Sequence, residues 1–179
     1  MLKVDSIDIT LSRAGFVLYL NLSKGGPYLP IIVGLAEAHS ITLAQNGIKP
    51  QRPLSHDLMS SILHHFDATL IKVVINNFKK GTYYAVIHLS TKDGEKAIDC
   101  RPSDAIALAL RTKSPVYITE NVMDAQTTGT EKHIKPPNDE LSDLDLLKEQ
   151  LDRAIQEERY EEAALLRDQI NGYHKLKLD

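Results

Sequence analysis

The stretch that decides the fold is residues 69–110, TLIKVVINNFKKGTYYAVIHLSTKDGEKAIDCRPSDAIALAL. It opens with two runs rich in β-branched, aromatic and aliphatic residues, Thr69–Phe78 and Thr82–Ser90. Lys79-Lys80-Gly81 separates them, and a short connection that ends in glycine is typical of a β-hairpin. This half of the stretch therefore predicts two paired antiparallel strands.

The second half of the stretch changes from strand to helix. A turn at Lys92-Asp93-Gly94 leads into a short strand that ends near Asp99. Pro102-Ser103-Asp104 has the residue types that start helices, and six apolar residues follow it. A helix that is apolar on nearly every side is a buried one, so we expect this helix at the centre of the domain.

The flanking sequence adds further strands and helices without strict alternation. Residues 2–34 are predicted as β structure, and residues 36–45 have helical periodicity that ends at an Asn-Gly pair. Ser55 is predicted to cap a helix that runs to about Phe66, and residues 116–119 form a last strand. Many of the links are hairpin-like, so we expect an α+β fold with a mixed or antiparallel sheet and packed helices, rather than a doubly wound sheet.

Composition and charge divide the chain into three parts. Residues 1–126 carry 13 Lys and Arg against 11 Asp and Glu, whereas residues 127–179 carry 8 against 13. A Thr-rich and Pro-rich stretch, residues 127–138, lies at the change and has the composition of a linker. We therefore expect a domain at 1–126, a linker at 127–140 and a helical hairpin at 141–179.

The last part has two apolar stripes at helical spacing. The first comprises Leu144, Leu147, Leu151 and Ile155, and the second Ala163, Leu166, Ile170 and Tyr173. Glu158-Arg159-Tyr160 lies between them, where we expect the chain to turn. A hairpin this short buries too little apolar surface to be very stable alone, so we expect it to pack against something else. The simplest partner is a second copy in a two-fold homodimer.

The cysteine content and the lengths of the apolar runs exclude several classes of protein. The single cysteine, Cys100, excludes a disulfide framework or a Cys-rich zinc site and favours a reducing compartment. No apolar run reaches the ~20 residues needed to span a bilayer, and the N-terminus lacks the pattern of a signal peptide. We expect a soluble, cytoplasmic protein that does not bind membranes.

Residues 151–170 resemble the UVR motif, a helical hairpin found in bacterial nucleotide-excision-repair proteins and in regulators of protease chaperones. The resemblance rests on an aromatic-acid pair, two alanines and an Arg-Asp pair: Tyr160, Glu161, Ala163, Ala164, Arg167 and Asp168. It implies that these residues contact a protein partner. An ordinary dimerisation hairpin would have nearly the same pattern.

The first 130 or so residues resemble the bifunctional nuclease (BFN) family, a domain of bacteria and plants. Three segments carry the resemblance: Leu29–Gly34 with Glu37-Ala38, Arg52–Leu58, and Ile98–Ala107. Cys100 stands where the family usually has Ala, and Ser55 replaces a common Thr. The resemblance implies a BFN-like fold and nuclease activity on both DNA and RNA, for which the family has no agreed catalytic mechanism.

Phosphodiester hydrolysis needs an activated water and neutralisation of charge on the phosphoryl oxygens, and the three segments contain suitable side chains. The candidate catalytic residues are His56, Asp57, Asp99 and Asp104. The candidate phosphate-binding residues are Arg52, Arg101 and Ser103, since arginine presents a bidentate donor fork to phosphate. Glu37 and Asp99 are the candidate ligands of a divalent Mg²⁺ or Mn²⁺.

Each of these residues also has a structural interpretation. Ser103 and Asp104 suit the first turn of their own helix, as Asp57 and Glu37 suit theirs, and Asp99 with Arg101 would make a buried ion pair. His39 and Ser40 are assigned no role. Two functions follow: a nuclease of broad specificity that recruits a protein partner, or a non-catalytic oligomeric adaptor linked to DNA repair or protease-chaperone machinery.

Overall fold

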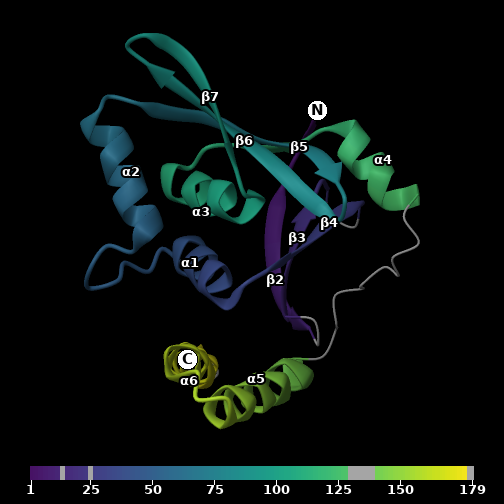
Figure 1. Cartoon of the computed structure of the whole chain (residues 1–179), viewed down its shortest axis with the longest axis vertical. Helices are drawn as coiled ribbons and strands as arrows, with labels where there is room; N and C mark the ends of the chain where they lie inside the picture. The colour runs from purple at the N-terminus through teal and green to yellow at the C-terminus, as the bar shows by residue number, and fades with distance from the viewer. Residues whose placement is uncertain (13–14, 24–25, 129–139, 177–179) are drawn as a thin grey trace.

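A computed structural model describes residues 1–12, 15–23, 26–128 and 140–176 of the chain. Its described part is an α+β structure with two sheets and six helices, as the sequence predicts (Figure 1). The sequence did not predict that the strands divide into two separate sheets.

The larger sheet has five strands in the order β1-β8-β5-β6-β7. Their bounds are β1 Leu2–Lys3, β5 Thr69–Lys79, β6 Thr82–Thr91, β7 Gly94–Cys100 and β8 Val116–Ile118. All neighbours are antiparallel except β5 and β8, which are parallel. The predicted hairpin is confirmed: Lys80 and Gly81 both have positive φ, which gives the connection the twist that paired strands require.

The smaller sheet is the antiparallel meander β2-β3-β4 near the N-terminus. Its strands are β2 Ser6–Ser12, β3 Gly15–Asn21 and β4 Tyr28–Val33. The middle strand is buried on both faces from Phe16 to Leu20, which explains why it reads as a continuous apolar run instead of an alternating one.

Three helices gather beside the larger sheet: α1 Leu35–Gln45, α2 Ser55–His65 and α3 Pro102–Thr112. Figure 1 shows α3 between α1, α2 and the sheet, and it contacts all three. Its first residue is Pro102, and nearly every residue as far as Ala109 is buried. The predicted central helix is therefore confirmed, and its position makes α3 the element that joins strand β7 to α1 and α2.

One local prediction, the cap of the second helix, is wrong. Ser55 is the first residue of α2 rather than its cap; Leu54 occupies the cap position, and its N–H donates to Asp57 Oδ2 at 2.9 Å. The aspartate at the third helical position thus satisfies an N–H group that a serine cap would leave free. In addition, α4 (Glu120–Thr128) extends into the stretch predicted as a linker, of which residues 129–139 lie outside the described part.

The C-terminal hairpin consists of α5 (Glu140–Gln156) and α6 (Tyr160–Leu176), with Glu158 at positive φ in the predicted turn. It packs against its own N-terminal domain: Leu147 and Leu166 are fully buried in the same apolar core as the strands, and α5 contacts β2. Ile155, predicted to share this packed face, is instead 51% exposed. The side chains of Leu144 and Tyr173 lie outside the described part.

No helix in the described residues has both the length and the apolar character needed to cross a membrane.

Candidate functional site

Arg101 lies at the junction of strand β7 and helix α3, where its extended backbone caps the helix. Its guanidinium turns back to Asp104 in the first turn and donates from Nε to Oδ2 at 2.7 Å and from Nη2 to Oδ1 at 3.0 Å. Nη1 lies 3.0 Å from Oε1 of Glu37 on α1. The side chain is 66% exposed, so a cation held by two carboxylates remains open to solvent.

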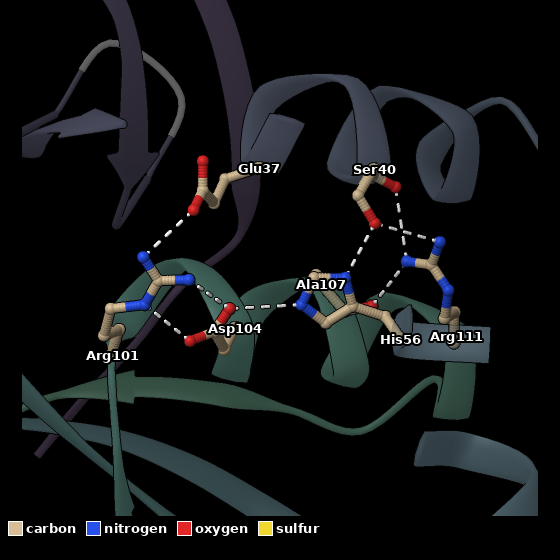
Figure 2. A network of polar contacts seen from close by, with 7 residues as sticks. All are labelled: Glu37, Ser40, His56, Arg101, Asp104, Ala107 and Arg111. Atoms are coloured by element: carbon tan, nitrogen blue, oxygen red, sulfur yellow. Dashed lines mark hydrogen bonds and ion pairs between the residues drawn. The ribbon is translucent and has the colours of Figure 1, made fainter. Parts of the chain in front are cut away.

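His56, in the first turn of α2, joins that surface to the interior. Its Nε2 lies 3.2 Å from Asp104 Oδ1, and its Nδ1 lies 2.9 Å from the hydroxyl of Ser40 on α1. Both His56 and Ser40 are buried. Figure 2 shows the imidazole between these two partners, so three helices meet at one ring.

Arg111, in the last turn of α3, forms the buried end of the same network. It donates from Nε to Asp57 Oδ1 at 2.6 Å and from Nη2 to Ser40 Oγ at 3.1 Å. Its Nη1 donates to the carbonyl oxygens of Ser40 and Ala107 at 3.2 and 2.9 Å (Figure 2). The guanidinium thus fastens α3 to both α1 and α2.

The direction of the hydrogen bonds follows from which groups can only donate. Because Arg111 has no acceptor, Ser40 Oγ accepts from it and keeps its own hydrogen for Nδ1 of His56. A neutral imidazole that accepts at Nδ1 carries its proton at Nε2, where it donates to Asp104. We assign this tautomer because it satisfies every polar atom from Arg111 to Arg101.

The two aspartates are held ionised. Burial raises the pKa of Asp104, but hydrogen bonds from Arg101 and His56 outweigh burial, and its pKa lies below the usual value. Burial also raises the pKa of Asp57. Hydrogen bonds from Arg111 and from the Leu54 N–H outweigh burial there too, so the pKa of Asp57 is lowered. The hydrogen bonds to Asp104 raise the pKa of Arg101 further. Asp57, Asp104 and Arg101 are therefore charged at neutral pH.

The structure brings five of the predicted site residues together: Glu37, His56, Asp57, Arg101 and Asp104. It unites the second and third segments of the resemblance through the contact between His56 and Asp104. These residues fill one network; their catalytic and binding roles stay predictions.

Three predicted residues lie apart from the network. Arg52 is exposed in the loop before α2, and Asp99 is exposed on β7. The ion pairs of Arg101 run to Asp104 and Glu37 rather than to Asp99, so the predicted Asp99–Arg101 pair is wrong. Ser103 is buried in the first turn of α3, which keeps its side chain off the surface.

Sequence reasoning missed Ser40 and Arg111. Both had a signal: Ser40 is one turn from Glu37 on the same helical face, and Asp104, Ala107 and Arg111 share a face of α3. An arginine at the end of an otherwise apolar buried helix needs buried acceptors. Its partners, however, come from α1 and α2, which lie more than fifty residues away.

The two carboxylates next to the exposed guanidinium are already paired with it, which bears on the expected divalent ion. In the part of the chain that the structure describes, no three His, Cys, Asp or Glu side chains form a group that could hold a metal. Glu37 is paired with Arg101, and so is Asp104. A cation would have to displace the arginine before it reached either carboxylate.

A cleft of about 720 Å³ borders the site on the side of the hairpin. Glu37 and its neighbours Leu35 and Ala36 line one wall, and residues 158–162 with Leu165 line the other. The first turn of α6 therefore faces the first turn of α1, next to the carboxylate that holds Arg101.

The residues of the UVR resemblance occupy two environments. Tyr160, Glu161, Ala164, Arg167 and Asp168 are exposed, whereas Ala163 is buried in the core that joins the hairpin to the domain. The exposed five are available to a partner, and Ala163 serves the packing of the chain itself.

Two family models match separate parts of the chain. The family model of the bifunctional nuclease domain matches residues 18–131, and that of the UvrB/uvrC motif matches residues 144–176. Both are located where the fold has its domain and its hairpin.

Curated relatives match at moderate identity. An uncharacterised protein of Mycobacterium tuberculosis is 39% identical over 107 residues, which cover 60% of this chain and 63% of that protein. Bifunctional nuclease 1 of Oryza sativa subsp. japonica is 27% identical over 177 residues, 86% of this chain and 53% of the plant protein. Bifunctional nuclease 2 of Arabidopsis thaliana is 27% identical over 182 residues, with 87% and 55% covered. The chain thus spans about half the length of these plant relatives.

Proposed function

Because the chain belongs to the bifunctional nuclease domain family, we propose that it hydrolyses phosphodiester bonds of DNA and RNA at the site around Arg101. One observation carries this choice of site: the exposed guanidinium of Arg101 is fixed by carboxylates from two helices. The family resemblance and the names of the plant relatives support the reaction class.

Arg101 is the proposed phosphate contact. Its two hydrogen bonds to Asp104 and its ion pair with Glu37 occupy Nε, Nη2 and Nη1 once each, so two of its five N–H groups remain for phosphate oxygens. Asp104 and Glu37 hold the fork in place before substrate arrives, which reduces the ordering needed on binding. A planar, bidentate donor of this kind neutralises charge that develops on the phosphoryl oxygens.

Asp104 is the proposed proton acceptor. In the proposed reaction a water oxygen attacks phosphorus and Asp104 takes a proton from that water. The leaving oxygen departs with the electron pair of the broken bond and takes a proton from solvent water. The lowered pKa of Asp104 keeps the carboxylate ionised for this role. His56 and Ser40 act as positioning residues, because the buried imidazole fixes Asp104 from behind.

The broad specificity of the proposal follows from the kind of contact. Phosphate groups are common to DNA and RNA and carry no sequence information, so a site that reads phosphate accepts both. The divalent ion predicted at Glu37 and Asp99 stays a prediction, and no step of the proposed reaction passes through it.

The hairpin is the proposed docking element for a protein partner. Its exposed residues Tyr160, Glu161, Ala164, Arg167 and Asp168 form the part of the UVR signature that a partner can reach. Tyr160 offers a large aromatic surface, a residue type enriched where proteins contact each other.

A second function, a non-catalytic adaptor, is favoured by one specific observation. Each carboxylate of the network already has an arginine partner: Asp57 pairs with Arg111, and Asp104 and Glu37 pair with Arg101. A network in which every carboxylate is paired can also serve to hold helices α1, α2 and α3 together. Activity measurements on purified protein separate the two functions.

The decisive assay is cleavage of labelled single-stranded DNA and RNA by the full chain, with Mg²⁺, Mn²⁺ or chelator present. We expect cleavage by the wild type and at least a ~100-fold loss of kcat/KM in Arg101→Ala, in line with loss of a donor that stabilises transition-state charge. Lys92→Ala is the matched control, since it also removes a cation that pairs with a carboxylate, Asp67, in the same domain.

The outcomes distinguish enzyme from contaminant and from adaptor. Activity that copurifies unchanged with Arg101→Ala would assign the hydrolysis to another protein or another site. Absence of cleavage under every metal condition, in a protein with a normal thermal transition, would leave the adaptor function.

A further inference from the structure

Helix α2 exposes most of its apolar side chains. Leu58, Met59, Ile62 and Phe66, which we call the α2 stripe, are 55%, 46%, 47% and 76% exposed. Phe66 directly follows the last helical residue, so the stripe runs from the fourth residue of the helix to just beyond its end.

The usual amphipathic arrangement is inverted in this helix. The side of α2 that faces α3 carries the polar network: His56 is its buried residue, and Asp57 pairs with Arg111. Only Leu63 of its apolar residues packs partly against the core. The spacing of Leu58, Met59, Ile62 and Leu63 makes them the apolar stripe of the helix, yet the first three are exposed. A soluble monomer rarely shows so many large apolar side chains together.

We propose that the α2 stripe is covered by the same stripe of a second copy of this chain, in an antiparallel two-fold dimer. This interaction goes beyond the proposed nuclease function and does not depend on it. It also differs from the dimer predicted through the C-terminal hairpin, whose buried leucines pack on the chain's own domain.

The spacing of the stripe is symmetric about its centre. Leu58 and Phe66 each lie four residues from Ile62, about one helical turn on either side. In an antiparallel pair related by a two-fold axis, Ile62 meets its own copy at the axis and Leu58 meets the partner's Phe66. Isologous contacts need this kind of self-complementarity, and the arrangement also sets opposite ends of the two helix dipoles beside each other.

The exposed apolar area supplies most of a small interface between two copies. At roughly 200 Å² for a large side chain, the exposed fractions leave roughly 450 Å² of apolar surface on each chain. Two copies would bury roughly twice that, and specific interfaces start near 1,200 Å² in total once a polar rim is included. Ser61 and His65, exposed beside the stripe, are residues that can supply such a rim.

Sedimentation of the full-length protein over a concentration series tests the proposal. We expect the wild type to sediment as a dimer and Ile62→Glu as a single chain, because a carboxylate at the axis would face its own copy. Ile155→Glu on α5 is the matched control, since it places the same charge at a residue of similar exposure and leaves the dimer intact.

A mixing experiment tests the pairing itself and guards against a variant that fails to fold. Leu58→Lys and Phe66→Glu each weaken the dimer when alone. Mixed, they restore it, because the lysine of one chain faces the glutamate of the other while the remaining Phe66 and Leu58 still meet. Near-wild-type circular dichroism of each variant shows that the fold is retained.

The contradicting outcomes are equally defined. A monomeric wild type at every concentration would overturn the proposal and leave the stripe to a different protein. Dimers that persist in Ile62→Glu, or a mixture that stays monomeric, would also overturn it, because the two-fold contact would then lie elsewhere.

Discussion

Arg111 shows how one residue can determine the packing of three helices. It makes four hydrogen bonds from α3 to residues of α1, α2 and its own helix, and the carboxylate it meets is only partly exposed. Removal of one partner leaves the other charge without compensation in a poorly solvated place. Arg111 is thus a structural counterpart to the exposed Arg101.

We expect Arg111→Met to lower the free energy of unfolding by about 3 kcal/mol, because Asp57 and Ser40 lose their donor. Lys92→Ala, which breaks an exposed pair with Asp67, should change it by less than about 1 kcal/mol. Urea unfolding of both variants measures the difference. Equal effects would show that the buried network contributes no more than a surface ion pair.

The lowered pKa values of Asp57 and Asp104 predict a pH dependence of stability. A carboxylate with a folded pKa below its unfolded value of about 3.9 stabilises the fold above that pH. The stabilisation is lost as pH falls from about 4 through the folded pKa. The urea concentration at the midpoint of unfolding should therefore decrease for the wild type as the pH is lowered from 7 to 2.

Asp57→Asn should reduce stability at neutral pH and flatten the acid decline, since one of the titrating groups is gone. Asp67→Asn, at the exposed pair, is the control and should keep the wild-type profile. If the stability of Asp57→Asn fell with decreasing pH as steeply as that of the wild type, the assignment of Asp57 to the network would be contradicted.

Among the individual residues of the site, sequence reasoning identified those that lie near turns and helix starts. Glu37, His56, Asp57, Arg101 and Asp104 all occupy first turns or cap positions, where local chemistry marks them. Ser40 and Arg111 were missed because each lies within a helix, and its function depends on neighbours distant in sequence.

The elements themselves were predicted well where turn chemistry is local. The β5–β6 hairpin and the start of α3 depend on the Lys-Gly turn and on Pro102, and both came out as expected. The burial of α2 could not be predicted in this way. Its apolar periodicity favours a core-facing helix, but the polar network orients the opposite side inward.

Substitutions in the C-terminal hairpin test whether it shares a core with the domain. Leu166 on α6 is fully buried in the core shared with the domain, so we expect Leu166→Ala to lower the free energy of unfolding by about 3 kcal/mol. Ile155→Ala, at an exposed position of α5, should change it by less than about 1 kcal/mol. Calorimetry measures both.

The same experiment reports cooperativity. If the hairpin and the domain share one core, Leu166→Ala shifts a single thermal transition to lower temperature. A separate early transition, with the domain unaffected, would show that the hairpin unfolds on its own.

The packing of the hairpin against the domain could not be predicted from the sequence. The pattern of residues predicted a hairpin in need of a packing surface, but not that its own domain supplies that surface. As a result, the first turn of α6 borders the cleft beside Glu37, one contact away from Arg101. The proposed partner-binding element and the proposed hydrolytic site are neighbours in space.

The central claim is that Arg101 and Asp104 act as one hydrolytic unit, and a double-mutant cycle on kcat/KM for a DNA oligonucleotide tests it most directly. Residues that act as a unit show losses that do not multiply. We predict that Arg101→Ala and Asp104→Asn each lower kcat/KM strongly and that the double variant is no slower than the worse single one. Single variants with wild-type rates, or losses that multiply in the double variant, would contradict the account.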